Sequence, residues 1–291
     1  MDQRIINLYD QFTHGGMNRR DFLDRLAGLA GSAAAGAALL PLLRNNYAQA
    51  AIVAADDGRL VTERVPYDSP HGKINGYLVR ATAKGKRPAI IVIHENRGLN
   101  PHIEDIARRL ALEGFLALAP DLLTLVGGTP PNEDAARDLH PKMNREHAIA
   151  ASVAAVSFLQ QHAESTGKVG AVGFCFGGGV VNRVATDSPD LAAGVAYYGV
   201  QPPADKVPTI KAALLLHYAE TDENVNKGIA AYESALKADN KKFTINIYPG
   251  TQHAFNNETG AARYNKQAAD LAWERTIGFF KEQLGAPPRA A

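Results

Sequence analysis

The chain of 291 residues has a single cysteine, Cys175, and almost no excess charge of either sign. One cysteine excludes an internal disulfide framework and any metal site built from several cysteines. The net charge of +1 lacks the basic excess that nucleic-acid binding requires. Hydrophobic residues make up 46% of the chain and charged residues 21%, a composition typical of one globular domain with a full-sized core. The cysteine is therefore core filler, an intermolecular partner or a nucleophile.

The first 50 residues differ from the rest of the chain. The pair Arg19-Arg20 precedes an apolar run rich in small residues, from Leu26 to Leu43. Tyr47-Ala48-Gln49-Ala50 follows, with the Ala-x-Ala pattern of a signal cleavage site. This order is similar to that of a twin-arginine export signal, although Asn18 and Asp24 depart from the usual pattern.

We therefore predict a signal peptide over residues 1–50 that is recognised by the twin-arginine export machinery and cleaved near Ala50. Residues 51–59 would be a linker, and the mature protein would be periplasmic or otherwise exported. The apolar run is barely long enough to span a bilayer, so an uncleaved signal that anchors the protein in the membrane is the alternative.

From residue 60 to 284 the sequence alternates between strand-like and helix-like patterns. Strands are predicted at 60–66, 75–81, 88–94, 115–119, 168–173, 191–198, 212–218 and 243–248. Helices are predicted within 103–113, 133–162, 178–185, 224–237 and 262–284, with a Gly- and Pro-rich loop at 122–132 and a flexible tail at 285–291. The first two strands read as an antiparallel edge. The alternation predicts one α/β domain with a mostly parallel sheet covered on both faces.

The pattern Gly173-x-Cys175-x-Gly177 stands between a buried strand and a helix of small residues. It has the form of a nucleophile elbow, in which a strained turn lifts the central side chain above the sheet. The positive end of the following helix favours a thiolate at that position. The alternative is a glycine-rich turn that holds a buried free cysteine.

Reactive side chains follow four of the predicted strands. They are Glu95, Cys175, Asp222 and His253. In sheets of this kind the chemistry lies at the carboxyl ends of the strands. The order nucleophile, acid, histidine is that of the α/β-hydrolase triad.

Each of these residues also has a simpler interpretation. Asp222 could cap the helix that follows it, His253 could be a polar loop group, and Glu95 could be a solvated carboxylate. The joint occurrence at four strand ends favours the functional interpretation. His94 is interpreted as a structural residue at a strand end, and His217 as a histidine of the core.

Five segments together resemble the dienelactone hydrolase family of α/β-hydrolases, and the resemblance covers residues 60 to 284. The segments are Val92–Asn100, Gly173–Gly178, the loop at Asp222, Tyr248–Phe255 and Trp273–Thr276. The resemblance implies an α/β-hydrolase fold with a sheet of about eight strands. It also implies a hydrolase of carboxylic esters, similar to a carboxymethylenebutenolidase, that needs no metal or organic cofactor.

The resemblance further implies a role for each candidate residue. Cys175 would be the nucleophile, His253 the base, and Asp222 the residue that orients His253. Glu95 would hold the resting thiol and help to form the thiolate. The backbone N–H groups of Phe176 and Asn96 would form the oxyanion hole.

The substrate-binding residues depart from the family pattern. An arginine that binds the substrate carboxylate is expected four residues after the histidine, where this chain has Asn257. A second arginine expected near residues 122–128 is also missing, and Arg97 or Arg263 would have to replace it. We therefore expect a monomeric, exported cysteine hydrolase of small esters or lactones. The alternatives are a broad-range carboxylesterase or thioesterase, and a non-catalytic periplasmic binding protein on a hydrolase fold.

Overall fold

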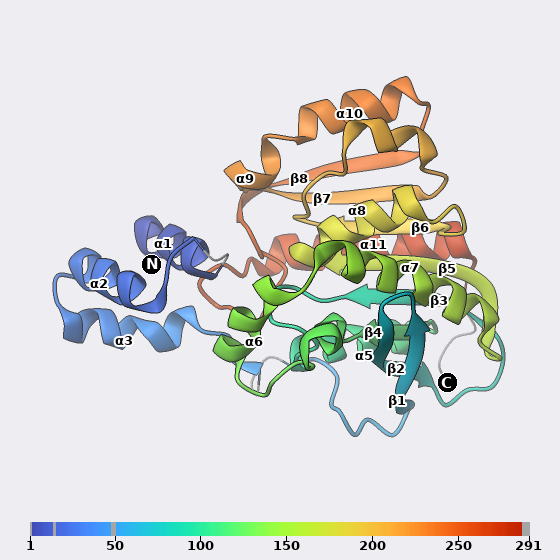
Figure 1. Ribbon diagram of the computed structural model, residues 1–291, viewed down its shortest axis with the longest axis horizontal. Coiled ribbons are helices and arrows are strands. Elements are labelled where there is room, and N and C mark those ends of the chain that lie inside the picture. Colours follow the sequence, from blue (N-terminus) through green and yellow to red (C-terminus); the bar gives the residue numbers. More distant parts are fainter. Residues whose placement is uncertain (1, 14–15, 48–50, 287–291) are drawn as a thin grey trace.

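The computed structural model describes residues 2–13, 16–47 and 51–286, and its centre is one sheet of eight strands (Figure 1). The strands are β1 (Leu60–Ser69), β2 (Gly72–Ala81), β3 (Arg87–Ile93), β4 (Leu116–Pro120), β5 (Ser165–Phe174), β6 (Ala193–Tyr197), β7 (Ala213–Thr221) and β8 (Phe243–Gln252). Their order is β1-β2-β4-β3-β5-β6-β7-β8. β2 is antiparallel to both β1 and β4, whereas the other neighbours are parallel. The predicted α/β-hydrolase fold with an antiparallel edge is confirmed.

Helices cover both faces of this sheet. They are α5 (Pro101–Leu112), α6 (Glu133–Leu139), α7 (Arg145–Gln161), α8 (Phe176–Asp187), α9 (Glu223–Asn226), α10 (Ile229–Ala238) and α11 (Lys266–Leu284). In the central strand β3, Ile90 and Val92 pack in the cluster formed with α5 and α11. Ile91 and Ile93 pack in the cluster formed with α7, α8 and α10. Because successive side chains alternate between faces, a strand covered on both sides must be apolar throughout.

Two helices differ clearly from the prediction. The single helix expected over 224–237 is divided into α9 and α10, with Gly228 at the break. A side chain there would meet Gln201, since a Cβ on Gly228 would lie 2.1 Å from Oε1 of Gln201. The last helix begins at Lys266 instead of residue 262, because the side chain of Asn265 accepts a hydrogen bond from the amide of Ala268 and caps the helix. The predicted loop at 122–132 opens with a 3-10 turn, Leu122–Val126.

The N-terminal segment folds into three helices, α1 (Gln3–Thr13), α2 (Arg19–Ala30) and α3 (Ala33–Leu43), drawn in blue in Figure 1. The apolar run from Leu26 to Leu43 therefore does not form one continuous helix. Gly31 adopts φ 85° at the end of α2, and Ser32 caps α3 through the amide of Ala35. Two local signals, a C-terminal glycine and an N-cap serine, thus produce a turn.

No single helix in the described part of the chain is long and apolar enough to cross a membrane. By length and composition α2 and α3 would suffice together, but they bend by 109° at the break between them. Residues 48–50, where cleavage is predicted, lie outside the described residues, as do residues 287–291 of the predicted tail. The predicted linker at 51–59 is without regular structure but is held to α5, because the amide of Val53 donates to Oδ1 of Asp105 over 2.7 Å.

Candidate active site

Cys175 lies in the turn between β5 and α8, with φ 55° and ψ −114°. A non-glycine residue rarely adopts a positive φ, and such strain costs about 1–3 kcal/mol. The flanking glycines make the turn possible. A Cβ on Gly173 would lie 2.2 Å from the carbonyl oxygen of Gly177, and a Cβ on Gly177 would lie 2.2 Å from that of Ile93. The predicted elbow is therefore present, and it leaves Cys175 half-buried at the edge of the sheet.

Asp222 follows β7 and touches the histidine that follows β8. Nδ1 of His253 lies 2.6 Å from Oδ2 of Asp222, and both residues are buried. The other oxygen of Asp222 accepts a hydrogen bond from the amide of Val225 over 3.4 Å. The cap predicted for Asp222 is confirmed, and the same carboxylate contacts His253, so the catalytic interpretation stays a prediction with the required contact present.

His253 and Cys175 line the same cavity and interact electrostatically. Burial by itself would lower the pKa of His253. The negative charge of Cys175 and hydrogen bonds to Asp222 and Cys175 outweigh burial, so the pKa of His253 is raised well above its ordinary value. The surroundings of His253 therefore favour its protonated form, the imidazolium.

Glu95, just beyond β3, is buried and accepts a hydrogen bond from Nδ2 of Asn257, with 2.9 Å between that nitrogen and Oε2. The oxygen of the Asn257 side chain accepts from the amide and the hydroxyl of Thr259. Asn257 therefore uses both ends of its amide within the protein. It positions Glu95, and neither Asn257 nor Glu95 belongs to the lining of the cavity that contains Cys175.

The two predicted oxyanion-hole residues, Phe176 and Asn96, line the same cavity as Cys175. Phe176 is the first residue of α8, where a backbone N–H has no partner within the helix. Asn96 lines the same cavity as Cys175 and His253. Its side chain donates to the carbonyl oxygen of Thr13 over 2.5 Å.

The cavity at Cys175 has a volume of about 580 Å³. Three arginines line it, namely Arg19, Arg137 and Arg145. Arg19 and Arg137 each form an ion pair with Asp134. The guanidinium of Arg145 makes no hydrogen bond or ion pair with any residue that the structure describes.

Arg97 and Arg263, expected from the sequence as replacements for the missing arginines, do not line this cavity. Arg97 is buried, donates to the hydroxyl of Tyr9 over 3.0 Å and lies 3.6 Å from Glu133. Arg263 is paired with Asp10 at 2.9 Å. Both arginines contact α1, and the expectation that they meet the substrate has no geometric support.

Tyr198 also lines the cavity, a position that the sequence analysis missed. It follows β6, has φ 37°, and is 1% exposed. Its ring centroid lies 4.9 Å from that of His253. Burial, and then the charges of Glu95 and Cys175, raise the pKa of Tyr198 well above its ordinary value. Its hydroxyl has no hydrogen-bond partner among the described residues. Its place at the carboxyl end of a strand next to the elbow strand was the available signal.

The two histidines assigned to structural roles have those roles. The ring of His94 contacts the carbonyl oxygen of Glu95 and accepts a hydrogen bond from the amide of Leu122. His217 is fully buried and contacts Tyr248 and Thr276. Within the described residues, no group of three or more His, Cys, Asp or Glu side chains is arranged to hold a metal ion.

Comparison with known proteins matches the sequence model of the dienelactone hydrolase family to residues 74–284. A model described as YqhI-like matches residues 1–31. A Saccharolobus solfataricus protein named "Putative carboxymethylenebutenolidase" is 34% identical over 253 residues, which span 74% of this chain and 96% of that protein. An Escherichia coli chain named "Putative hydrolase fragment YghX" is 52% identical over 110 residues, or 37% of this chain and 94% of its own. The crystal structure of a "Putative Dienelactone Hydrolase" from Klebsiella pneumoniae has a TM-score of 0.69 at 29% identity, and covers 77% of this chain and 99% of its own.

Proposed function

Because the chain belongs to the dienelactone hydrolase family and is a hydrolase that acts on ester bonds, we propose that Cys175 is its nucleophile and that it cleaves small esters or lactones through a thioester. The observation that carries this proposal is the 2.6 Å contact of Asp222 with His253, in a cavity that both residues line together with Cys175. A buried carboxylate fixes the tautomer and orientation of the histidine, and the histidine in turn stabilises a thiolate.

In the first half-reaction the thiolate of Cys175 attacks the carbonyl carbon of the ester. A C–S bond forms, and the electron pair of the carbonyl moves onto its oxygen. The N–H groups of Phe176 and Asn96 are proposed to donate to this oxyanion. When the intermediate collapses, the C–O bond of the ester breaks and the alkoxide takes the proton from the imidazolium of His253. In a lactone the alcohol stays attached to the acyl group.

In the second half-reaction a water molecule attacks the thioester. Neutral His253 removes a proton from this water, and Asp222 stabilises the imidazolium that forms. The new oxyanion collapses, the C–S bond breaks, and the carboxylic acid leaves while Cys175 returns to the thiolate. We also propose that Glu95, held by Asn257, keeps Cys175 in the thiol form before substrate binds, and that the thiol proton passes to His253 when the thiolate forms.

The experiment that tests the proposal is the acylation of Cys175 by p-nitrophenyl acetate. The wild-type protein should release a burst of one p-nitrophenolate per chain, and the burst should be absent in Cys175→Ala. Cys175→Ser is the matched control, because it keeps the shape of the side chain and replaces only the sulfur. The chain has no second cysteine that could react. Unchanged turnover in Cys175→Ala would overturn the proposal.

A broad-range carboxylesterase or thioesterase is the second candidate. The size of the cavity and the apolar side chains in its lining, among them Phe176, Val200 and Val225, favour it. A panel of neutral lactones, alkyl esters and acyl thioesters separates the candidates. A preference of more than about tenfold for lactones supports the narrower function.

Export is a separate proposal that rests on the sequence pattern around Arg19-Arg20. We propose that the twin-arginine machinery carries the folded protein across the membrane into the periplasm. Both arginines are exposed, which agrees with recognition of the folded chain. Cell fractionation of the wild type and of a variant with Arg19→Lys and Arg20→Lys tests it, since the variant should remain in the cytoplasm. Equal amounts of both proteins in the periplasm would rule out this route.

A further inference from the structure

The helices α1, α2 and α3 pack around an apolar centre of their own. Its members are Ile5, Leu8, Tyr9, Phe12, Phe22, Leu26 and Leu43. The rings of Phe12 and Phe22 stack with 4.3 Å between their centroids, and Leu26 is completely buried. A segment that buries this much apolar surface is stabilised as a folded unit.

This helical unit contacts the hydrolase domain at the loop of residues 95–97. We call this segment the oxyanion loop, because it contains Asn96, a proposed oxyanion donor. The carbonyl oxygen of Thr13, in the last turn of α1, accepts the hydrogen bond from Asn96. The hydroxyl of Tyr9 accepts the one from Arg97, and Asp10 pairs with Arg263. Asn96 and Arg97 directly follow Glu95, so the end of α1 holds the loop on which a proposed oxyanion donor lies.

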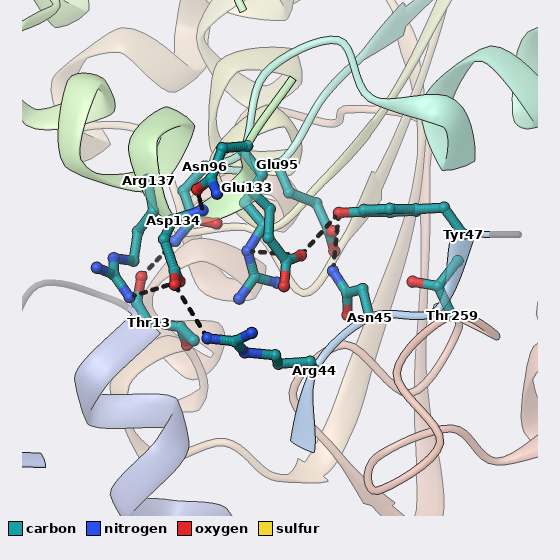
Figure 2. Close-up of polar contacts among 12 residues, drawn as sticks. Thr13, Arg44, Asn45, Tyr47, Glu95, Asn96, Glu133, Asp134, Arg137 and Thr259 are labelled. Carbon is teal, nitrogen blue, oxygen red and sulfur yellow. Dashed lines mark hydrogen bonds and ion pairs between the residues drawn. The ribbon is translucent and has the colours of Figure 1, made fainter. Parts of the chain in front are cut away.

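Further polar contacts attach the unit to α6, as the close-up in Figure 2 shows. Asp134 forms one ion pair with the guanidinium of Arg44, at 3.3 Å, and another with that of Arg137. The hydroxyl of Tyr47 donates to Glu133 over 3.2 Å. The guanidinium of Arg137 also lies 4.1 Å from the ring centroid of Phe12, a cation–π distance.

The unit also forms part of the catalytic cavity. Phe12, Thr13, Met17 and Arg19 line it together with Cys175 and His253. Without the first 43 residues, this side of the cavity would open to solvent. The buried guanidinium of Arg97 would also lose the hydroxyl of Tyr9, and a buried charge that loses a partner is strongly destabilising.

We infer that α1, α2 and α3 stay with the mature enzyme as a wall of its substrate cavity, in which Phe12 and Met17 limit the length of the acyl group. The inference rests on the proposed ester hydrolysis at Cys175. It chooses between the two fates of the N-terminal segment, because cleavage near Ala50 would remove the wall. The contact of Thr13 with Asn96 and that of Tyr9 with Arg97 would position the oxyanion loop.

The wall is tested in the full-length protein with p-nitrophenyl acetate, butyrate and octanoate. Shortening a side chain that limits the cavity should favour the longest ester. Phe12→Ala and Met17→Ala should each raise the ratio of kcat/KM for octanoate over acetate by about tenfold. Leu42→Ala is the matched control, since Leu42 belongs to the same unit but is 55% exposed and lies outside the cavity lining. An unchanged ratio in both cavity variants would overturn the inference.

The positioning role is tested with Tyr9→Phe, which removes one hydroxyl and keeps the ring in the apolar centre. A shifted oxyanion loop should lower kcat several-fold for all three esters and change KM little, because the lost contact acts on the transition state. A purely structural role of Tyr9 would lower the melting temperature and leave kcat unchanged, which contradicts positioning.

The mature N-terminus is read from the intact mass of the active protein purified from its final compartment. The inference predicts that the mass includes α1, α2 and α3. A fully active protein that begins after Ala50 and has the same ester selectivity would contradict it. Failure of the proposed function is distinguishable, because it would appear as a missing burst in the wild type.

Discussion

The carboxylate of Asp222 contacts both the ring of His253 and the first turn of α9. Its Oδ2 lies 2.6 Å from Nδ1 of His253, and its Oδ1 accepts a hydrogen bond from the amide of Val225. The acid of the proposed triad is therefore held in place by the helix that it caps. The helix amide fixes the direction of the carboxylate before a substrate arrives, which is the preorganisation that catalysis requires.

The double role predicts a separation between Asp222→Asn and Asp222→Ala. Asparagine caps helices as well as aspartate does, so Asp222→Asn should keep the cap of α9 while kcat falls by a factor on the order of 10²–10⁴, because the charge that stabilises the imidazolium is lost. Asp222→Ala should lose the same activity and about 1 kcal/mol of stability in addition. Burst kinetics and thermal unfolding measure the two effects. Equal stabilities of the two variants would show that the contact with Val225 contributes nothing.

The raised pKa of His253 predicts that Cys175 controls the protonation of this histidine, which NMR can measure. Burial by itself would lower the pKa of His253. The charge of Cys175, together with hydrogen bonds to Asp222 and Cys175, outweighs burial and raises this pKa well above the ordinary value of about 6.5. Removing the sulfur in Cys175→Ala should therefore lower the pKa of His253. The stability gained from this protonation is complete below about pH 6.5 and is lost as the pH rises through the folded-state pKa. Denaturant unfolding above neutral pH should show that loss in the wild type and less of it in Cys175→Ala.

The hydroxyl of Tyr198, which has no hydrogen-bond partner in the described part of the chain, predicts opposite effects on stability and activity. A buried hydroxyl without a partner costs about 1–3 kcal/mol, so Tyr198→Phe should not destabilise the protein and should raise the free energy of unfolding by about 1 kcal/mol. If the hydroxyl donates to the substrate in the cavity, kcat/KM should fall about tenfold. Unchanged kinetics in a more stable variant would assign Tyr198 to packing alone.

The low pKa of the buried His217 predicts that the protein loses stability in acid. This effect is separate from the proposed catalytic residues. Burial, and to a smaller extent the charge of Arg275, lower the pKa of His217 to about 3. The unfolded chain binds a proton at this histidine below about pH 6.5 whereas the folded chain does not, so stability should fall as the pH falls between these two values. The slope is on the order of 1 kcal/mol per pH unit. Denaturant unfolding at pH 7 and pH 5 should show a smaller difference in His217→Gln than in the wild type.

The sequence was most informative where a short pattern implies a backbone shape. The glycines around Cys175 predicted the elbow, and the structure contains it because no side chain fits at Gly173 or Gly177. The strand ends carrying Asp222 and His253 were predicted to meet, since parallel strands end at one edge of the sheet, and their side chains are in contact.

The sequence was least informative where function depends on distant segments. Asn257 stands where the family has an arginine, yet its partner is Glu95, which lies 162 positions away along the chain. The contact of Thr13 with Asn96 joins residues 83 positions apart. An apolar run that follows an arginine pair has the same composition whether it enters an export channel or packs on a domain. Only the fold showed that this run is divided between α2 and α3 and packs with α1.

The sequence by itself determined an α/β domain with a mostly parallel sheet, the elbow and the order of Cys175, Asp222 and His253, because periodicity, glycine geometry and strand ends are local properties. Its resemblance to a family added the α/β-hydrolase fold. The tertiary structure alone decided which side chains surround the cavity. It brought α1 against the loop of Asn96, turned Arg97 and Arg263 toward that helix, and placed Tyr198 beside His253. Those contacts depend on how separate elements pack, and packing follows from the shapes and charges of the whole chain.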